Sequence, residues 1–357
     1  MIQTFSSTIR RKEMDAVLTC MVDEKLGPGE LNAKLIQTVK EFTGCDGAVA
    51  FRSPAIAFSY VVKALDLQPG ESVMISALAP SWHYTAVKNL GLNPLVLDVR
   101  EEDGLISPES VEEGIKNGGR LLLLHETMGI LPKIEDFLAF GIPVIEDISH
   151  SVGAVYPAAP AEGSETPDNK ENAPKKAGMA GLYSILGLEA NDTITAGGGA
   201  VLISPKRREW IVLKKFTDNA PETDILPDMN SALGFIQMKE FARNEQARKA
   251  LFAIFQKSLM SGKNKTFVRE AEEGSTIWSF PVVLSGSFKD AKQYSSRKEI
   301  EIRPAYENSV IAVLADEEQS KFIHAKSLYL RCVLFPLYPR LGSESATKIA
   351  KVLGTLP

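Results

Sequence analysis

Seven short apolar segments, separated by polar stretches of helical character, constrain the fold of this chain more than any other feature. They are apolar throughout rather than alternately apolar and polar, which is typical of strands covered on both faces. Strands that alternate with helices predict a mostly parallel sheet with right-handed crossovers. We therefore expect an α/β fold of three layers around a seven-stranded sheet, formed by Gly47–Phe51, Val73–Leu78, Pro94–Val99, Leu121–His125, Pro143–Asp147, Gly181–Leu186 and Gly199–Ser204.

The remaining sequence predicts how the chain divides. Apolar residues recur at helical spacing over residues 30–43, and a long helical pattern starts at Met229. We expect a large domain over residues 1–250 and a smaller α+β domain over 251–357, with strands within 277–284 and 332–337 and a last helix near Ser343–Leu353. Residues 157–176 are rich in Pro, Ala and charge and contain no large apolar side chain, which predicts a mobile surface insertion.

Composition narrows the class of protein. The 357 residues are 44% apolar and 24% charged, as in ordinary globular proteins, and 40 basic against 45 acidic side chains leave a net charge of −5. The densest basic cluster, Arg10–Lys12, is followed at once by acidic residues, so we expect no nucleic-acid binding. Three cysteines without metal-type spacing predict reduced thiols and no metal site. Without a secretory signal or a membrane-spanning run, a cytoplasmic location is expected.

Polar residues at the ends of the predicted strands indicate where a functional site would lie. In parallel sheets, ligands collect where the carboxyl ends of the strands open. Asp147, His125 and the region of Trp82 all follow such strand ends. A glycine turn at 197–199 then leads into another strand, and the whole stretch from 177 to 205 contains no lysine.

With these parts in order, the chain resembles the DegT/StrS family of sugar aminotransferases, which depend on pyridoxal phosphate (PLP) and have the fold type I of aspartate aminotransferase. The resemblance covers nearly the whole length. It is carried by Ala48-Val-Ala-Phe-Arg-Ser-Pro-Ala-Ile-Ala57, Leu95-Val-Leu-Asp98-Val, His125-Glu-Thr-Met-Gly129, Pro143-Val-Ile-Glu-Asp147-Ile-Ser-His150-Ser-Val-Gly153, Met229-Asn-Ser-Ala-Leu-Gly234-Phe-Ile-Gln237 and Leu334-Phe-Pro-Leu-Tyr-Pro339.

The resemblance assigns roles to individual residues. Asp147 matches the carboxylate that faces the pyridine nitrogen, and Trp82 matches the aromatic residue that stacks on the cofactor ring. His150 stands where the family usually has glutamine, beside the ring hydroxyl, and would hydrogen-bond it or move a proton. Each of these three also has a structural interpretation: a helix cap for Asp147, a core or interface residue for Trp82, and a satisfied structural residue for His150.

Other family positions have changed in this chain. The lysine that forms the Schiff base is replaced by Glu189, which can neither form that bond nor act as a free amine. In the phosphate cradle, Gly-Thr becomes Pro54-Ala55, and proline has no N–H to donate. Ser53 and Ser184 remain as hydroxyl donors. The family's partner-subunit segment is reduced to roughly Thr223–Leu226.

These changes leave three hypotheses. The first is a degenerate, non-transaminating homologue with a binding, regulatory or partner role, with or without a cofactor. The second is a lysine-independent enzyme that holds PLP or its amine form (PMP) noncovalently and uses His150 or Glu189 as the base. The third is an atypical sugar aminotransferase with a lysine from elsewhere. The resemblance further implies a homodimer and a sugar nucleotide or another small molecule as ligand.

Overall fold

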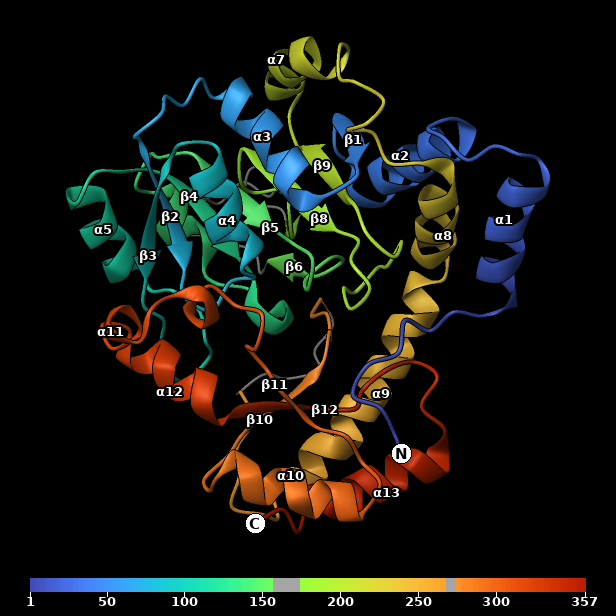
Figure 1. The fold of residues 1–357 in the computed structure, drawn as a ribbon, viewed down its shortest axis with the longest axis vertical. Coiled ribbons are helices and arrows are strands. Elements are labelled where there is room, and N and C mark those ends of the chain that lie inside the picture. The colour runs from blue at the N-terminus through green and yellow to red at the C-terminus, as the bar shows by residue number, and fades with distance from the viewer. Residues whose placement is uncertain (157–173, 268–273) are drawn as a thin grey trace, which may run out of the picture.

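The computed structural model describes residues 1–156, 174–267 and 274–357, and it has a central sheet of seven strands (Figure 1). The strand order is β1-β9-β8-β5-β4-β2-β3, and only β9 runs antiparallel to its neighbours. All seven predicted strands are confirmed, as is the mostly parallel sheet. The strands are β1 (Gly47–Phe51), β2 (Ser72–Ser76), β3 (Asn93–Leu97), β4 (Gly119–His125), β5 (Val144–Asp147), β8 (Tyr183–Gly187) and β9 (Ala200–Ser204).

Helices cover both faces of this sheet, which makes three layers. One face packs against α3 (Pro54–Ala64), α4 (Trp82–Asn89) and α7 (Arg207–Thr217). The other face packs against α2 (Glu30–Thr43), α5 (Pro108–Lys116), α6 (Ile134–Leu138) and α8 (Asp228–Lys239), with α1 (Arg11–Val22) lying along α8. The predicted helix at 30–43 is therefore confirmed.

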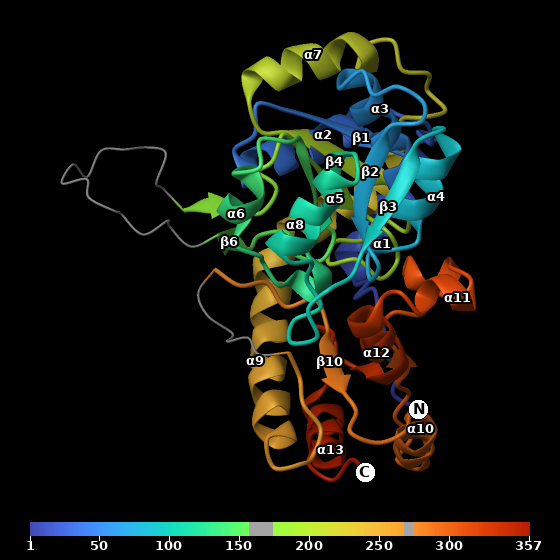
Figure 2. The same cartoon turned by 90° about the vertical axis from the view of Figure 1, so that its left-hand side faces the viewer.

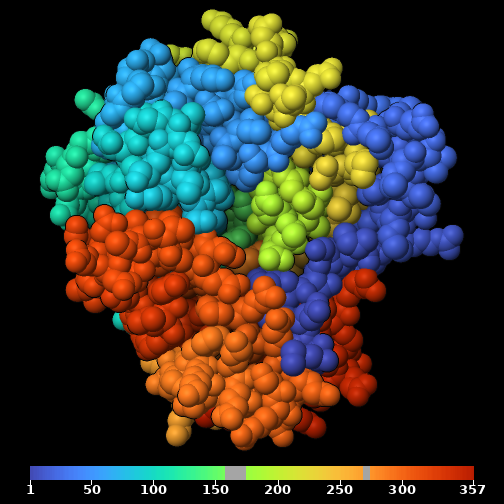
Figure 3. Space-filling model, viewed as in Figure 1, coloured from blue at the N-terminus to red at the C-terminus, as the bar shows by residue number. Residues whose placement is uncertain are grey.

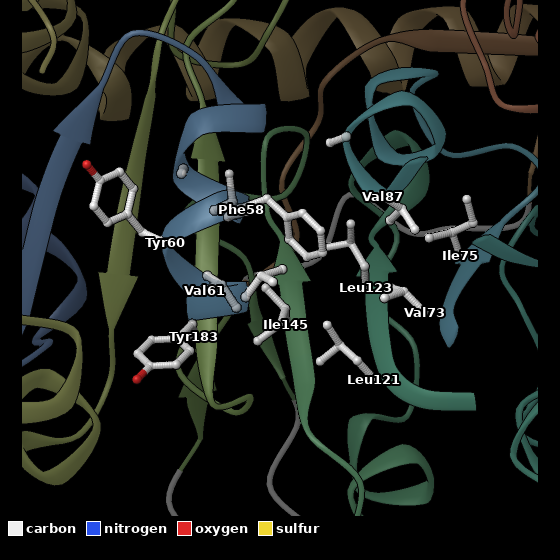
Figure 4. Close-up of a cluster of buried hydrophobic side chains, with 14 of the residues drawn as sticks. Phe58, Tyr60, Val61, Val73, Ile75, Val87, Leu121, Leu123, Ile145 and Tyr183 are labelled. Atoms are coloured by element: carbon white, nitrogen blue, oxygen red, sulfur yellow. The ribbon is translucent and has the colours of Figure 1, made fainter. Parts of the chain in front are cut away.

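The core explains why the strands are apolar throughout. In β4, Leu121 and Leu123 point into the cluster under α3 and α4, shown in Figure 4. Leu122 and Leu124 point into the opposite cluster, under α5 and α6. Each buried leucine contributes about 1.5–3 kcal/mol of apolar transfer free energy, so neither face of the strand tolerates a polar pattern.

The C-terminal part forms a second, smaller body below the sheet (Figures 1 and 2). Helix α9 (Phe241–Leu259) runs down from the sheet into it, so the predicted domain boundary at residue 250 falls inside this helix. The small sheet has the order β10-β12-β11. Its elements are β10 (Phe280–Val283), α10 (Phe288–Arg297), β11 (Arg303–Pro304), the 3₁₀ turn Ile311–Val313, α11 (Asp316–Gln319), α12 (Ile323–Arg331), β12 (Cys332–Phe335) and α13 (Ser343–Leu353).

The predicted surface insertion at 157–176 is only partly within the described residues. Residues 157–173 lie outside them. Lys175 and Lys176 form the short strand β7, which pairs with β6 (Val155–Tyr156), so the end of the segment belongs to a regular ladder. A two-stranded ladder is held by backbone hydrogen bonds and does not require apolar side chains. The polar composition of these two residues therefore gave no sign of a strand, and they were predicted to belong to the insertion.

Two further sequence expectations have an outcome in the structure. All three cysteines are buried and unpaired, as expected for reduced thiols. Within the described ranges, no helix combines the length and apolarity needed to cross a lipid bilayer.

Candidate functional site

The carboxyl ends of β4 and β5 place two candidate residues side by side. His125 and Asp147 are the last residues of these strands and are paired in the parallel register. The loop after β2 leads into α4, whose first two residues are Trp82 and His83. The three segments meet at one edge of the sheet, as the strand order requires.

Asp147 is held by four hydrogen bonds from the chain itself. Its Oδ2 accepts from His83 Nε2 at 2.8 Å and from His125 Nδ1 at 3.0 Å. Its Oδ1 accepts from the backbone N–H of Ser149 at 3.1 Å and from the Ser149 hydroxyl. Two donors at each oxygen use the capacity of a carboxylate, so the side chain is saturated without any ligand.

Asp147 carries the negative charge of this buried network. Burial by itself would raise the pKa of the Asp147 carboxyl, but His125 and His83 hold it well below its ordinary value. Burial lowers the pKa of His83, so that imidazole is neutral and donates through Nε2. The two histidines and Asp147 also bring three metal-type ligand atoms within 4.8 Å of one another, with both carboxylate oxygens already hydrogen-bonded.

His150 lies next to this network and stacks on Trp278 from the C-terminal part. Their ring centroids are 3.7 Å apart and the planes differ by 13°. On its other side, His150 meets the edge of His125, with centroids 4.9 Å apart. Burial and His125 hold the pKa of His150 well below its ordinary value, and its Nδ1 has no hydrogen-bond partner in the described part of the chain. Three of the four histidines of the sequence thus gather at this edge.

These residues border a cavity of about 470 Å³, the main cavity, between the large sheet and the C-terminal part. The segments around it meet near the middle of the face in Figure 3: the cyan start of α4, the yellow-green loop after β8, the orange C-terminal segments and the blue N-terminal segment. Its wall includes aromatic, polar and charged side chains, among them Phe5, Ser53, Trp82, His125, Thr127, His150, Glu189, Asn191, Asp192, Trp278, Arg303, Tyr306 and Glu307.

Glu189, predicted to replace the Schiff-base lysine, lies on the wall of the main cavity. It follows β8, and its backbone N–H donates to Asp192 Oδ2 at 2.8 Å. Burial raises the pKa of the Asp192 carboxyl to about 8. The described residues that line the cavity include no lysine. Lys206 follows β9, which runs antiparallel to β8, so it lies at the opposite edge of the sheet from Asp147.

The two predicted hydroxyl donors are both hydrogen-bonded within the chain, Ser53 as an acceptor and Ser184 as a donor. Ser53 lines the main cavity, but its Oγ accepts from the backbone N–H of Ile56 at 3.2 Å and caps α3, whose first residue is Pro54. Ser184 does not line the cavity: it is fully buried and donates to the carbonyl of Gly178 at 2.9 Å. The glycine turn before β9 is required by its backbone, because Gly199 has a φ of +113° and a Cβ there would lie 2.4 Å from Leu226.

The structure therefore brings together Asp147, His150, Trp82, Ser53 and Glu189 and leaves Ser184 apart. Sequence reasoning did not identify His83, Trp278 or Tyr306. His83 directly follows a predicted site residue, and that adjacency was the available signal. Trp278 and Tyr306 come from the C-terminal part, more than a hundred residues away, and no local pattern links them to the sheet edge.

Comparison with known proteins agrees with this architecture. The curated protein EpsN of Bacillus subtilis (strain 168), a putative pyridoxal phosphate-dependent aminotransferase, is 22% identical over 307 residues, covering 78% of this chain and 74% of EpsN. The putative sugar aminotransferase Spr1654 of Streptococcus pneumoniae in its PLP form superimposes with a TM-score of 0.84 at 15% identity, covering 98% and 96% of the two chains.

A second structural relative is a dehydratase. The E. coli GDP-4-keto-6-deoxy-D-mannose-3-dehydratase, solved with bound hydrated PLP, has a TM-score of 0.80 at 17% identity and covers 99% of both chains. Finally, the model of the DegT/DnrJ/EryC1/StrS aminotransferase family matches residues 7–354. This match covers almost the whole length, and it agrees with the seven-stranded sheet and with the motifs along it. The chain therefore belongs to the DegT/DnrJ/EryC1/StrS aminotransferase family.

Proposed function

We propose that this protein is a non-transaminating member of its family, which binds a small molecule noncovalently in the main cavity and has a binding, regulatory or partner role. The observation that carries the proposal is Glu189 on the cavity wall, with no lysine among the described lining residues. Transamination needs an amine that first forms a Schiff base and then moves a proton. A carboxylate cannot form the Schiff base.

The family implies pyridoxal phosphate, and the residues of this chain do not fit that group. The carboxylate that would face the pyridine nitrogen is saturated by His83, His125 and Ser149. At the start of α3, Pro54 has no N–H and Ala55 has no hydroxyl, so two of the usual donors to a dianion are missing. Glu189 adds a negative charge to the same wall. No step through the cofactor is therefore derived.

The ligand that suits this wall is a small polar molecule with a flat or ring-shaped apolar face. Trp82 and Trp278 offer aromatic surfaces, while Asn191, Glu189 and Tyr306 offer hydrogen-bonding groups. The relatives named above, a sugar aminotransferase and a dehydratase of a GDP-linked sugar, point to sugars, which have both features. A sugar or sugar nucleotide held without a covalent bond is thus the proposed ligand class.

The alternative is a lysine-independent enzyme that holds PLP or PMP noncovalently. Two observations favour it: Asp147 stays ionised, and His125 lies between that carboxylate and the main cavity. In this arrangement the carboxylate fixes one ring nitrogen of the imidazole, as in acid–base pairs of hydrolases. An atypical aminotransferase is the weakest hypothesis, because Lys206 lies at the wrong edge of the sheet.

Titration of the purified protein with PLP and with PMP tests the proposal. We expect no Schiff-base absorbance, no lysine labelled after borohydride reduction, and no saturable rise in melting temperature with either compound. A PMP-dependent rise that Asp147→Asn abolishes would establish the alternative instead. A labelled lysine would overturn the proposal in favour of an aminotransferase.

We also propose a homodimer, as the family resemblance implies. Exposed apolar side chains on and just after α1, namely Met14, Leu18, Met21, Val22 and Leu26, support a buried contact with another chain. Light scattering coupled to size exclusion measures the mass directly. A mass of one chain at all concentrations would contradict the proposal.

A further inference from the structure

A second, smaller cavity of about 40 Å³ lies beside the main one and has no role in the function proposed above. The N-terminal segment at 5–8, the loop after β8, α8, α9 and the segment at 337–339 enclose it. Hydroxyl groups dominate its wall, and one buried arginine, Arg248, reaches it from α9. Its volume has room for a group of a few heavy atoms, not for an organic cofactor.

Arg248 has a buried hydrogen-bond donor without an acceptor. The residue is 6% exposed, and its Nε donates to Glu245 Oε2 at 3.2 Å. The other Glu245 oxygen accepts from the backbone N–H of Ile277 at 2.7 Å, which holds the glutamate in place. Nη2 of Arg248 has no partner in the described part of the chain. A buried charged N–H without an acceptor costs more free energy than a neutral one, so an acceptor is expected in this cavity.

Thr193 presents a second unsatisfied group to the same cavity. It is 6% exposed, its backbone N–H donates to the carbonyl of Ser149 at 3.2 Å, and its Oγ1 has no partner among the described residues. Thr195 lies on the same wall and is also buried; its Oγ1 accepts from the backbone N–H of Gly197 at 3.0 Å. Its hydroxyl hydrogen is not used by that bond. A guanidinium N–H and two threonine hydroxyls are thus available as donors on one small cavity.

We propose that the second cavity is an oxyanion site, in which Arg248 and Thr193 bind a phosphate-sized group. Guanidinium and hydroxyl donors are the groups that recognise phosphate oxygens. The carboxyl of Asp192, which also lines this cavity, is mostly uncharged at neutral pH because burial raises its pKa to about 8. It therefore adds no second negative charge to that of Glu245, which pairs with Nε of Arg248 and leaves Nη2 available.

Two sources of this oxyanion are consistent with the geometry. Phe5, Asn191, Asp192 and Trp278 line both cavities, so the two spaces share a wall. The group is either a free phosphate ion or the phosphate arm of a molecule whose body lies in the main cavity. The chemistry at Arg248 and Thr193 is the same in both cases.

Calorimetric titration with inorganic phosphate, at an ionic strength kept constant with chloride, tests the site itself. We expect saturable binding that Thr193→Val weakens about tenfold or more, since a hydrogen bond to a charged group is lost. Thr38→Val, on an exposed position of α2, is the matched control and should bind as the wild type does. Thr193→Val is preferred to a change at Arg248, because loss of that arginine leaves Glu245 buried without its partner.

Titration with glucose 1-phosphate distinguishes the two sources. If this ester binds more tightly than inorganic phosphate and Trp82→Ala removes only that advantage, the oxyanion is the arm of a larger ligand. If the ester binds no better than phosphate, the site takes the free ion. Absence of saturable phosphate binding, or equal binding by the wild type and Thr193→Val, would overturn the proposal and leave a cavity that holds water.

Discussion

His83 Nε2 donates a hydrogen bond of 2.8 Å to Asp147 Oδ2, and both side chains are completely buried. The donor comes from the helix after β2 and the acceptor from the end of β5. An imidazole of the chain itself therefore donates to the carboxylate that the resemblance predicted to face a cofactor ring.

The first prediction concerns this bond. His83→Leu should lower the free energy of unfolding by about 1–3 kcal/mol at pH 7, because a buried carboxylate loses one of its donors. Urea denaturation measures the change. The control His324→Leu removes a histidine whose side chain is 53% exposed and should stay within about 0.5 kcal/mol of the wild type. Equal stability of His83→Leu and the wild type would mean that the bond contributes nothing.

The second prediction concerns pH and His150. Burial lowers the pKa of His150 in the folded state. Below pH 6.5, the unfolded chain therefore binds a proton at this residue that the folded chain does not bind. The contribution of neutral His150 to the free energy of unfolding is therefore complete above pH 6.5. It falls as the pH drops below that value, by at most about 1.4 kcal/mol per pH unit. His150→Gln should remove this dependence.

The difference in unfolding free energy between the wild type and His150→Gln, measured from pH 7.5 to 5, checks the sign. It should shift in favour of the variant as the pH falls. A difference that stays constant with pH would show that His150 titrates alike in both states.

The third prediction concerns a buried pair of glutamates behind the site. Burial and the neighbouring Glu146 raise the pKa of Glu126 well above its ordinary value, so its carboxyl keeps a proton. It contacts the hydroxyls of Ser151 and Tyr156. A raised carboxyl pKa lowers stability progressively as the pH rises above about 4.5, where the unfolded chain releases the proton. Relative to the wild type, Glu126→Gln should therefore gain stability between pH 5 and pH 8.

Glu146→Gln is the matched contrast. The Glu146 carboxyl accepts backbone N–H groups from Gly178 at 2.8 Å, Ala180 at 3.0 Å and Gly181 at 2.5 Å. An amide has only one acceptor oxygen and would turn an N–H toward these donors, which should cost about 1–3 kcal/mol. Thermal unfolding of both variants separates the two roles. Equal losses in the two proteins would contradict the assignment of the proton to Glu126.

The fourth prediction concerns recovery of cofactor chemistry. Glu189→Lys alone should give little lysine trapped by borohydride with PLP, because position 54 still lacks an N–H and position 55 a hydroxyl at the start of α3. Adding Pro54→Gly and Ala55→Thr supplies an N–H and a hydroxyl, and this triple variant should trap at least about tenfold more. Peptide mapping identifies the labelled residue. Stoichiometric labelling of the single variant would show that the cavity never lost its affinity for the cofactor.

The sequence predicted the sheet well because its signal is local. A strand covered on both faces must be apolar at every position, and β1 begins and ends at the residues that the pattern indicated. Helices α2 and α13 likewise follow from apolar spacing. The position of Asp147 at a strand end followed from the same pattern. The absence of a lysine between 177 and 205 can be read directly from the sequence.

Only the tertiary structure decided what these residues touch. Whether the Asp147 carboxylate is free or saturated depends on His83 and His125, which come from two other segments. Ser184 was predicted as a hydroxyl donor to a ligand, yet its hydroxyl donates to Gly178 and does not reach the main cavity. Nη2 of Arg248, which has no partner among the described residues, and the cavity beside it have no signature in the sequence at all. Whether two distant segments form a hydrogen bond depends on differences of a few tenths of an ångström in the donor–acceptor distance. Apolar periodicity does not encode such differences.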